Sequence, residues 1–428
     1  MNIAIAVPAS RTAVRWKIFC LMLTLVTVNY IDRSSLSVAM PLIAKEFDLR
    51  PAMQGLMFSA FFWAYALMQV PSGLLSDRFK PRIVIAAATI IWGVCQGLAG
   101  LCGSATALLL TRLGLGASEA PVMPAGGKLN AIWMAPNERG RAATMLSGGS
   151  PLGAALGSLL IAGLIATFGS WRLAFITAGA GTVLVGLFAW YFIRNSPRDH
   201  RGVNAEEADY IEQAHAAEHR TSGMASGKTR ELFRYRSVWC MILGYTFSNI
   251  VFFGLLTWLP SYLAKVHGLD IRQMGSATFL IYICGFAGEI FAGNLGDRWK
   301  NAGGRPNTVM RTLLCISAAI VTLAAFSVGY VTDRTLTIVL LCVTMFFLRW
   351  SGLYWSIPAI IGMPGKVGLL GGLMNLGSNL GGALVPLVIG VIVQMTGSYF
   401  LAMMVFTGAG AGLLICSLGI NYEKKIPV

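Results

Sequence analysis

Long apolar stretches recur along almost the whole chain, and this feature constrains the fold more than any other. A helix that crosses a bilayer needs about 20 mostly apolar residues. Twelve stretches of this kind can be read from the sequence, at residues 16–40, 53–76, 83–102, 105–126, 142–167, 172–193, 238–263, 274–296, 309–330, 335–358, 366–394 and 399–420. Only 12% of the residues are charged and 56% are hydrophobic, a balance that excludes a soluble domain. The sequence therefore predicts an all-α membrane protein with twelve transmembrane helices.

The distribution of Lys and Arg between the loops predicts the orientation in the membrane. On the side of the N-terminus, the loops and the adjoining span ends hold 24 of the 33 basic residues, and those on the opposite side hold six. Because Lys and Arg concentrate in cytoplasmic loops, we expect both termini in the cytoplasm and the protein in the inner membrane. The first span leads into further spans without a cleavage site, so we expect no cleaved signal peptide. The net charge of +15 is explained by these basic cytoplasmic segments, so we do not take it as a sign of nucleic-acid binding.

A long polar stretch at residues 194–237 divides the spans six and six. It predicts a cytoplasmic linker between an N-terminal bundle at residues 1–193 and a C-terminal bundle at residues 238–428. The middle of this linker, residues 205–220, has the composition of a short surface helix with a solvated polar face. The eight cysteines are scattered through apolar stretches without a C-x-x-C pair, so we expect neither disulfides nor a metal or cofactor site.

A short charged motif follows the second span and occurs again after the eighth. The two copies comprise Gly73, Asp77, Arg78 and Arg82, and Gly293, Asp297 and Arg298. The two Asp residues are 220 positions apart, which indicates duplicated halves. We expect the Gly to permit close helix approach and the Asp to cap a helix or pair with Arg, so that the motif locks the cytoplasmic face in one state. The chain here resembles the major facilitator superfamily, which implies two pseudo-symmetric six-helix bundles around a central site.

Six charged residues fall well inside the predicted spans, away from their ends: Asp32, Arg33, Arg112, Glu119, Glu289 and Arg349. A charge at the bilayer centre costs at least ~2.5 kcal/mol on insertion scales, so such residues are rare and usually functional. Arg112 and Glu119 are seven residues apart, which leaves them about 20° from one helical face. Asp32 and Arg33 point about 100° apart and should reach different partners, one of which could be Arg112. Two purely structural ion pairs are the alternative, which we disfavour because buried pairs stabilise less well than apolar packing.

Longer motifs narrow the resemblance. They lie at residues 29–39, 58–65, 69–73, 112–121 and 371–375. These segments look like the anion:cation symporter family, which includes galactonate, hexuronate, glucarate and phthalate-type permeases. The resemblance implies a secondary transporter that takes up an organic acid anion, such as a sugar acid, dicarboxylate or aromatic carboxylate, together with protons.

The resemblance also implies roles for individual residues. Arg33 would grip the substrate carboxylate, while Asp32 and Glu119 would carry the coupled protons, with Arg112 paired to them. The other positions placed with the substrate are Tyr30, Tyr65, Ser150 and Asn375. Gly352 and Tyr354 depart from the smaller hydroxyl residues of the galactonate-type members, and Arg349 appears where those members have no charge. These departures argue against galactonate itself.

Arg349 stands among aromatic residues in the tenth span, and two readings of it remain open. If it faces the cavity, it holds a second carboxylate, which favours a dicarboxylate or an aromatic acid contacted by the ring of Trp350, Tyr354 or Trp355. In the other reading it reaches the membrane interface or pairs with Glu289.

The interior charges predict how anion and proton are coupled. A carboxylate that pairs with Arg33 removes the partner of a nearby acid, which then takes up a proton, so the two ligands favour each other's binding. A drug or metabolite exporter, or an anion exchanger, of the same superfamily is the alternative function. A membrane sensor is disfavoured by the central charges, and an enzyme by the lack of a nucleophile–base constellation or a P-loop. We expect the carrier to work as a monomer.

Overall fold

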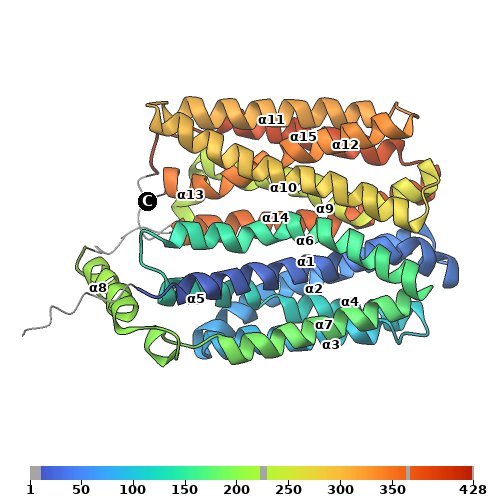
Figure 1. Cartoon of the computed structure of the whole chain (residues 1–428). Coiled ribbons are helices and arrows are strands. Elements are labelled where there is room, and N and C mark those ends of the chain that lie inside the picture. Colours follow the sequence, from blue (N-terminus) through green and yellow to red (C-terminus); the bar gives the residue numbers. More distant parts are fainter. Residues whose placement is uncertain (1–10, 222–228, 363–366, 427–428) are drawn as a thin grey trace, which may run out of the picture.

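The computed structural model describes residues 11–221, 229–362 and 367–426, and the regular structure in these ranges is helical throughout. The first half of the chain forms α1 (Val14–Glu46), α2 (Pro51–Arg78), α3 (Pro81–Ala99), α4 (Ala105–Glu119), α5 (Val122–Trp133), α6 (Arg139–Phe168) and α7 (Trp171–Phe192). The second half forms α9 (Arg236–His267), α10 (Ile271–Asn301), α11 (Pro306–Val328), α12 (Arg334–Leu348), η3 (Arg349–Ser356), α13 (Ile357–Ile361), α14 (Val367–Thr396) and α15 (Phe400–Gly419). The long helices run along one common axis, with the two halves stacked on each other (Figure 1).

Eleven of the helical segments in the described ranges are long and apolar enough to cross a membrane. The remaining span is the fourth in chain order and consists of α4 and α5. Each of these helices is too short by itself, because the span is interrupted at Ala120 and Pro121. The predicted all-α architecture of twelve spans in two halves is therefore confirmed. Proline at the first helical position begins α2, α3 and α11, where its missing N–H costs no hydrogen bond.

The fourth span of each half is interrupted at a matching place. In the N-terminal half, α4 ends at Glu119. In the C-terminal half, α12 gives way at Arg349 to the 3₁₀ segment η3. Irregular backbone at membrane depth is tolerated only where it is buried in protein or lines a water-filled cavity. Short 3₁₀ stretches inside long helices often mark functional hinges. The two breaks thus place one charged residue of each half at the centre of the molecule.

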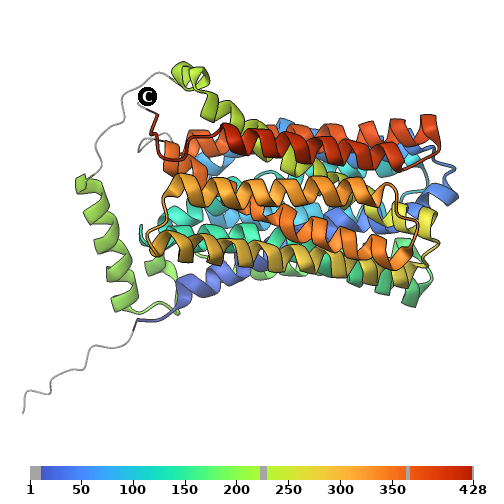
Figure 2. The ribbon, with the colours of Figure 1, turned by 90° about the horizontal axis from the view of Figure 1, so that it is seen from above.

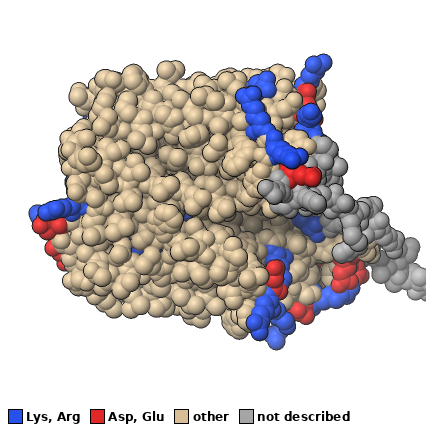
Figure 3. All heavy atoms as spheres, turned by 180° about the vertical axis from the view of Figure 1, so that it is seen from behind, with Lys and Arg blue, Asp and Glu red and all other residues tan. Residues whose placement is uncertain are grey.

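The linker between the halves lies at the end of the bundle where both chain termini emerge (Figure 2). It contains η1 (Pro197–Asp199), α8 (Ala205–Thr221) and η2 (Thr229–Arg234), so the helix predicted at residues 205–220 is present. The polar face of α8 is not simply solvated, because Glu207 is fully buried and accepts hydrogen bonds from Thr12 Oγ1 at 2.6 Å and Arg15 Nη1 at 2.7 Å. Most of the visible Lys and Arg side chains also gather at this end (Figure 3).

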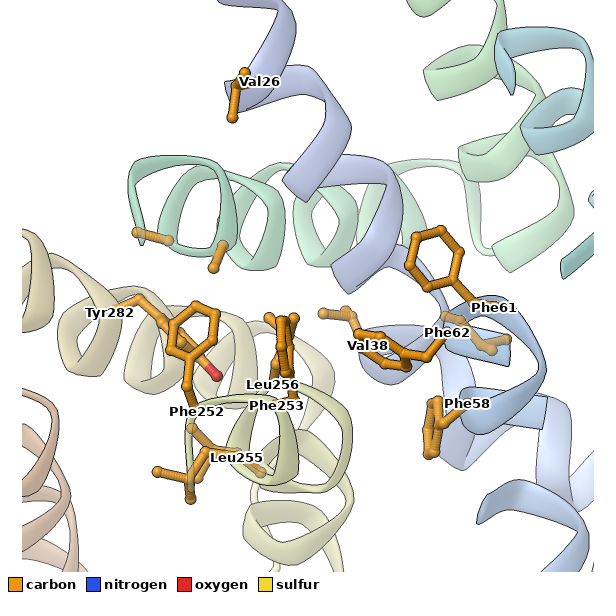
Figure 4. Packing of buried hydrophobic residues seen from close by; sticks show 14 of the residues in the cluster. Val26, Val38, Phe58, Phe61, Phe62, Phe252, Phe253, Leu255, Leu256 and Tyr282 are labelled. Atoms are coloured by element: carbon orange, nitrogen blue, oxygen red, sulfur yellow. The ribbon is translucent and has the colours of Figure 1, made fainter. Parts of the chain in front are cut away.

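The two halves meet tightly at the end away from the termini. A Cβ on Gly55 of α2 would lie 2.5 Å from the carbonyl oxygen of Pro386 in α14, so the two backbones are in direct contact. Ser59 Oγ donates a hydrogen bond of 2.6 Å to the carbonyl oxygen of Ala383. Phe62 of α2 points toward Phe253 of α9 with ring centroids 4.7 Å apart (Figure 4). We call this contact between α2, α9 and α14 the seam.

Candidate functional site

A central cavity lies between the two halves and has an empty volume of about 950 Å³, including the part that opens to solvent. Its walls contain seven of the residues predicted for the site: Tyr30, Arg33, Tyr65, Glu119, Ser150, Arg349 and Asn375. They come from α1, α2, α4, α6, η3 and α14, so both halves contribute. The structure therefore brings together side chains that are up to 345 residues apart in the sequence.

The N-terminal half contributes an ion pair to this cavity. Arg33 Nε donates a hydrogen bond of 2.9 Å to Glu119 Oε2, and the two side chains are only 8% and 0% exposed. The guanidinium carbon of Arg33 lies 4.7 Å from the ring centroid of Tyr30, 4.6 Å from that of Phe61 and 4.9 Å from that of Tyr65. Rings of this kind hold a guanidinium group through cation–π attraction. Arg33 is thus fixed in position while remaining at the cavity wall.

Close backbone packing positions this pair. A Cβ on Gly116 of α4 would lie 2.2 Å from the carbonyl oxygen of Phe61 in α2, so only glycine fits at this crossing. Gly116 is three residues before Glu119, almost one helical turn. The contact therefore brings the end of α4 close to the ring of Phe61 that covers Arg33.

Asp32 and Arg112 lie behind the cavity wall and do not line the cavity. Asp32 is completely buried, and its Oδ2 accepts hydrogen bonds from Trp92 Nε1 at 3.0 Å and Thr182 Oγ1 at 2.8 Å. Arg33 therefore faces the cavity while its neighbour faces α3 and α7, as the 100° separation predicts. The other carboxylate oxygen of Asp32, Oδ1, has no hydrogen-bond partner among the described residues.

The predicted ion pairs of Arg112 are not formed in the described part of the chain. Its Nη2 donates to Gln96 Oε1 at 3.2 Å, and Gln96 Nε2 in turn donates to Ser35 Oγ at 2.9 Å. The physical reason is that Arg33 already occupies one oxygen of Glu119, while the hydrogen bonds of Asp32 come from α3 and α7. The charges of both acids still act on Arg112 through space.

The C-terminal half contributes a second ion pair, in which Arg349 faces the cavity and also pairs with Glu289. Arg349 lines the cavity, and its Nη2 lies 2.7 Å from Glu289 Oε2. Glu289 also lines the cavity. The side chains are 12% and 20% exposed, which is more than in the N-terminal pair. The sequence identified Glu289 as an intramembrane acid, but only the structure places it in the wall of the site.

Tyr354 does not line the cavity, and its prediction as a substrate contact is corrected. It is fully buried, and its hydroxyl forms a hydrogen bond of 2.9 Å with Ser417 Oγ on α15. The neighbouring Trp355 lines the cavity instead and donates to the Tyr245 hydroxyl at 2.9 Å. The 3₁₀ geometry of η3 explains the difference, because residues turn by about 120° per position there and not by about 100°.

The sequence analysis missed several polar cavity residues, namely Asn29, Tyr245, Asn249, Ser351, Ser378 and Asn379. A signal for part of this set exists. Asn375, Ser378 and Asn379 are three and four residues apart in an apolar helix, a spacing that puts them on one face. A polar stripe of this kind in a membrane span is expected to face protein or water and not lipid.

The duplicated charged motif lies at the end of the bundle that carries the termini. Lys128 Nζ donates to the carbonyl oxygens of Ser76 at 2.7 Å and Asp77 at 3.1 Å, which satisfies the end of α2. Arg82 Nε donates to the carbonyl oxygen of Trp190 at 2.8 Å. The motif thus connects α2 to α5 and α3 to α7 within the N-terminal half.

The predicted lock between helices is not made in this structure. Asp77, Arg78, Asp297 and Arg298 are exposed, and no ion pair joins them to another described residue. The expected close helix approach at Gly73 and Gly293 is also wrong for this state, because a Cβ at either position would meet nothing within 4 Å. Close contacts between the halves lie instead toward the opposite end of the bundle, at the seam and between α6 and α10, where a Cβ on Gly275 would lie 2.4 Å from Ala162 Cβ.

Two six-helix halves around a cavity lined by paired charges define a membrane transporter of the alternating-access type. The model of the Major Facilitator Superfamily matches residues 22–386, and the chain belongs to this superfamily. It is therefore a transporter and not an enzyme.

Known relatives support the narrower resemblance. The chain is 33% identical over 418 residues to the probable sulfoacetate transporter of Cupriavidus necator, covering 96% of this chain and 95% of the relative. It is 31% identical over 428 residues to the probable galactarate/D-glucarate transporter of Escherichia coli K12, again covering 96% and 95%. The predicted similarity to anion:cation symporters is thereby confirmed. Among solved structures, a bacterial homologue of the human lysosomal transporter Spinster matches with a TM-score of 0.75 at 20% identity over 96% of this chain and 97% of that one, a likeness in fold.

Proposed function

We propose that this protein takes up an organic acid anion together with protons across the cytoplasmic membrane, with both termini in the cytoplasm, and that it works as a monomer. The observation that carries the proposal is the pair of Arg33 and Glu119 in the cavity wall. Arg33 can bind a substrate carboxylate, and Glu119 can bind a proton. In the structure they pair with each other, so a substrate carboxylate must compete with Glu119 for Arg33. The related sulfoacetate and galactarate/D-glucarate transporters are named for acids, which agrees with this chemistry.

The coupling follows from the exchange of partners at Arg33. A substrate carboxylate that pairs with the guanidinium group displaces Glu119, whose carboxylate would then be buried without a cation. A buried carboxylate without a partner is costly and takes up a proton instead. Binding of the anion and binding of the proton therefore stabilise each other, and this coupling is reciprocal.

The shape of the bundle supports alternating access. The seam closes one end of the cavity, whereas the charged motifs at the end with the termini form no lock. With the termini in the cytoplasm, this is an inward-facing state. Rocking of the halves would separate the seam and bring Asp77 and Asp297 into the closing face.

The membrane potential sets a minimum for the number of protons. With the cell interior negative, entry of one net negative charge is opposed by about 2.3 kcal/mol per 100 mV. One proton for each carboxylate removes this penalty. Uptake of an acid thus requires at least one protonatable residue at the site, and Glu119 meets that need in the N-terminal half.

Uptake into proteoliposomes containing the purified protein tests the proposal. An imposed inward proton gradient should drive accumulation of radiolabelled sulfoacetate, D-glucarate or another acid from a panel of sugar acids, dicarboxylates and aromatic acids. An uncoupler should abolish the accumulation. If labelled acid accumulates only against preloaded acid and ignores the gradient, the protein is an anion exchanger. If organic cations or neutral drugs move and acids do not, the proposal is wrong.

A further inference from the structure

We infer that the ion pair of Arg349 and Glu289 is a second site for an acidic group and a proton, so that the transporter grips a dianion at both ends and carries two protons with it. This inference rests on the proposed uptake of an acid with protons. It adds the substrate class and the number of coupled ions.

The second pair matches the first in its chemistry and in its access to the cavity. Both pairs consist of an arginine hydrogen bonded to a glutamate, at 2.9 Å for Arg33 and Glu119 and at 2.7 Å for Arg349 and Glu289. All four residues line the same cavity. One pair belongs to each half, so a guest that bridges them contacts both moving parts of the carrier.

Close packing of α10 against α12 holds the second pair in place. A Cβ on Gly288 would lie 2.0 Å from the carbonyl oxygen of Phe346, and a Cβ on Gly285 would lie 3.1 Å from Arg349 Cγ. On the other side, a Cβ on Gly352 would lie 3.1 Å from Glu289 Oε1. Glycine at these three positions lets the arginine and the glutamate approach each other where α12 becomes η3.

The contacts of Arg349 leave room for a further acceptor. Its Nε has no hydrogen-bond partner among the described residues although it is buried. A guanidinium group offers five N–H donors, so one carboxylate does not use its capacity. The side chain of Glu289 is 20% exposed to the cavity, whereas that of Glu119 is 0% exposed. A purely structural ion pair would not require this access.

A chain of aromatic rings limits the distance between the two arginines. The guanidinium carbon of Arg33 is 4.7 Å from the Tyr30 ring centroid, this centroid is 6.3 Å from that of Phe252, and the Phe252 centroid is 4.9 Å from the guanidinium carbon of Arg349. The two carbons are therefore at most about 16 Å apart. A six-carbon diacid spans roughly 6 Å between its terminal carbons, and each bidentate pair adds about 4 Å. An extended six-carbon diacid with its two pairs thus covers about 14 Å, which is close to this upper limit.

The charges that face the guest then set the number of protons that its binding takes up, because Asp32 and Arg112 lie behind the wall and keep their hydrogen bonds to Trp92, Thr182 and Gln96. Among the described residues that line it, Glu119 and Glu289 are the acids, Arg33 and Arg349 the cations, and Tyr30, Tyr65 and Tyr245 the remaining titratable groups. The empty site is neutral. A dianion that takes both arginines displaces both glutamates, and two protons restore neutrality. A monoanion displaces one glutamate and needs one proton.

The ratio of protons to substrate in proteoliposomes tests the inference. The probes are the six-carbon dianion D-glucarate and a sugar-acid monoanion that the wild type accumulates in the uptake panel, with proton movement followed by a trapped pH-sensitive dye. The wild type should move two protons with a dianion and one with the monoanion. Glu289→Gln should move one proton with a dianion, and an interior-negative potential should then slow this uptake. In the double variant Arg349→Gln and Glu289→Gln, the KM for the dianion should rise at least tenfold relative to Glu289→Gln.

Several outcomes separate this inference from the proposed function. If the wild type moves no protons with any acid, the proposed function fails and this inference fails with it. If the wild type couples protons but Glu289→Gln still moves two with a dianion, or if monoanions alone are carried, only the inference is overturned. Should Glu289→Gln not transport, calorimetric binding in buffers of different ionisation enthalpy replaces the flux assay. The number of protons taken up with a bound dianion should fall by one, and an unchanged number contradicts the inference.

Discussion

Replacement of Glu119 by Gln removes the acid of the N-terminal pair while keeping its shape. Arg33 then loses its carboxylate partner in a place where both side chains are at most 8% exposed. Breaking a buried ion pair by removal of one partner costs about 3–5 kcal/mol, and the hydrogen bond that the amide oxygen still accepts offsets part of this. A substrate carboxylate relieves the remainder. If about 1–2 kcal/mol remains, the substrate should bind roughly 5- to 30-fold more tightly near neutral pH.

The same substitution should uncouple transport. One unit of pH difference supplies about 1.4 kcal/mol per proton, so a protein that carries one proton per monoanion accumulates that anion about tenfold. Glu119→Gln cannot release a proton at this position, and accumulation of a monoanion that the wild type carries should fall to equilibration. Exchange of labelled for unlabelled acid should continue, because exchange needs no net proton movement.

Proteoliposome uptake, counterflow and calorimetric binding measure these effects together. Glu46→Gln is the matched control, since Glu46 pairs with Arg172 at the far end of the bundle and outside the cavity. It should accumulate acid like the wild type. If Glu119→Gln lost exchange and binding together with accumulation, Glu119 would be a structural residue and the competition at Arg33 would be the wrong mechanism.

Three further predictions concern other parts of the molecule. Arg33→Lys keeps the charge but loses the planar fork that matches a carboxylate, so the KM for uptake should rise roughly tenfold, by about 1.4 kcal/mol. Tyr354→Phe should leave the KM unchanged and lower the free energy of unfolding by about 1 kcal/mol, measured by denaturation in detergent, because it loses only the hydrogen bond to Ser417. Gly55→Leu should hold the seam open, since even a Cβ would lie 2.5 Å from the Pro386 carbonyl oxygen; uptake should stop, and a membrane-impermeant reagent should reach the cavity from the side of the seam.

The sequence predicts the fold and much of the cavity because the bilayer permits few alternatives. Spans must be apolar and about 20 residues long, so their number is readable. A charge such as Arg33 or Glu119 is too costly in lipid to point outward, and both line the cavity. Asp32 points about 100° away from Arg33, as the helical angle predicts.

The parts that could not be predicted depend on contacts between helices and on departures from helical geometry. Arg112 bonds to Gln96 because of the way in which α3 packs against α4. The spacing of residues along the sequence does not predict this packing. The direction of Tyr354 depends on the 3₁₀ turn that begins at Arg349. A regular helix at about 100° per residue would rotate Tyr354 to a different face. The approach of Arg349 to Glu289 likewise depends on the glycine contacts between α10 and α12.

The construction of the seam has a consequence for the energy of switching. Its closest contacts are made by backbone atoms, as between Gly55 and Pro386 and between Gly390 and Pro51, whose carbonyl oxygen would lie 2.6 Å from a Cβ on Gly390. Helices in a bilayer gain little from hiding apolar surface from each other, so small-residue contacts of this kind hold by dispersion forces over a short range. Such a contact weakens steeply once the backbones separate by an ångström or two. The closed and open arrangements can then be nearly equal in free energy, and the modest binding energy of a small acid is enough to choose between them.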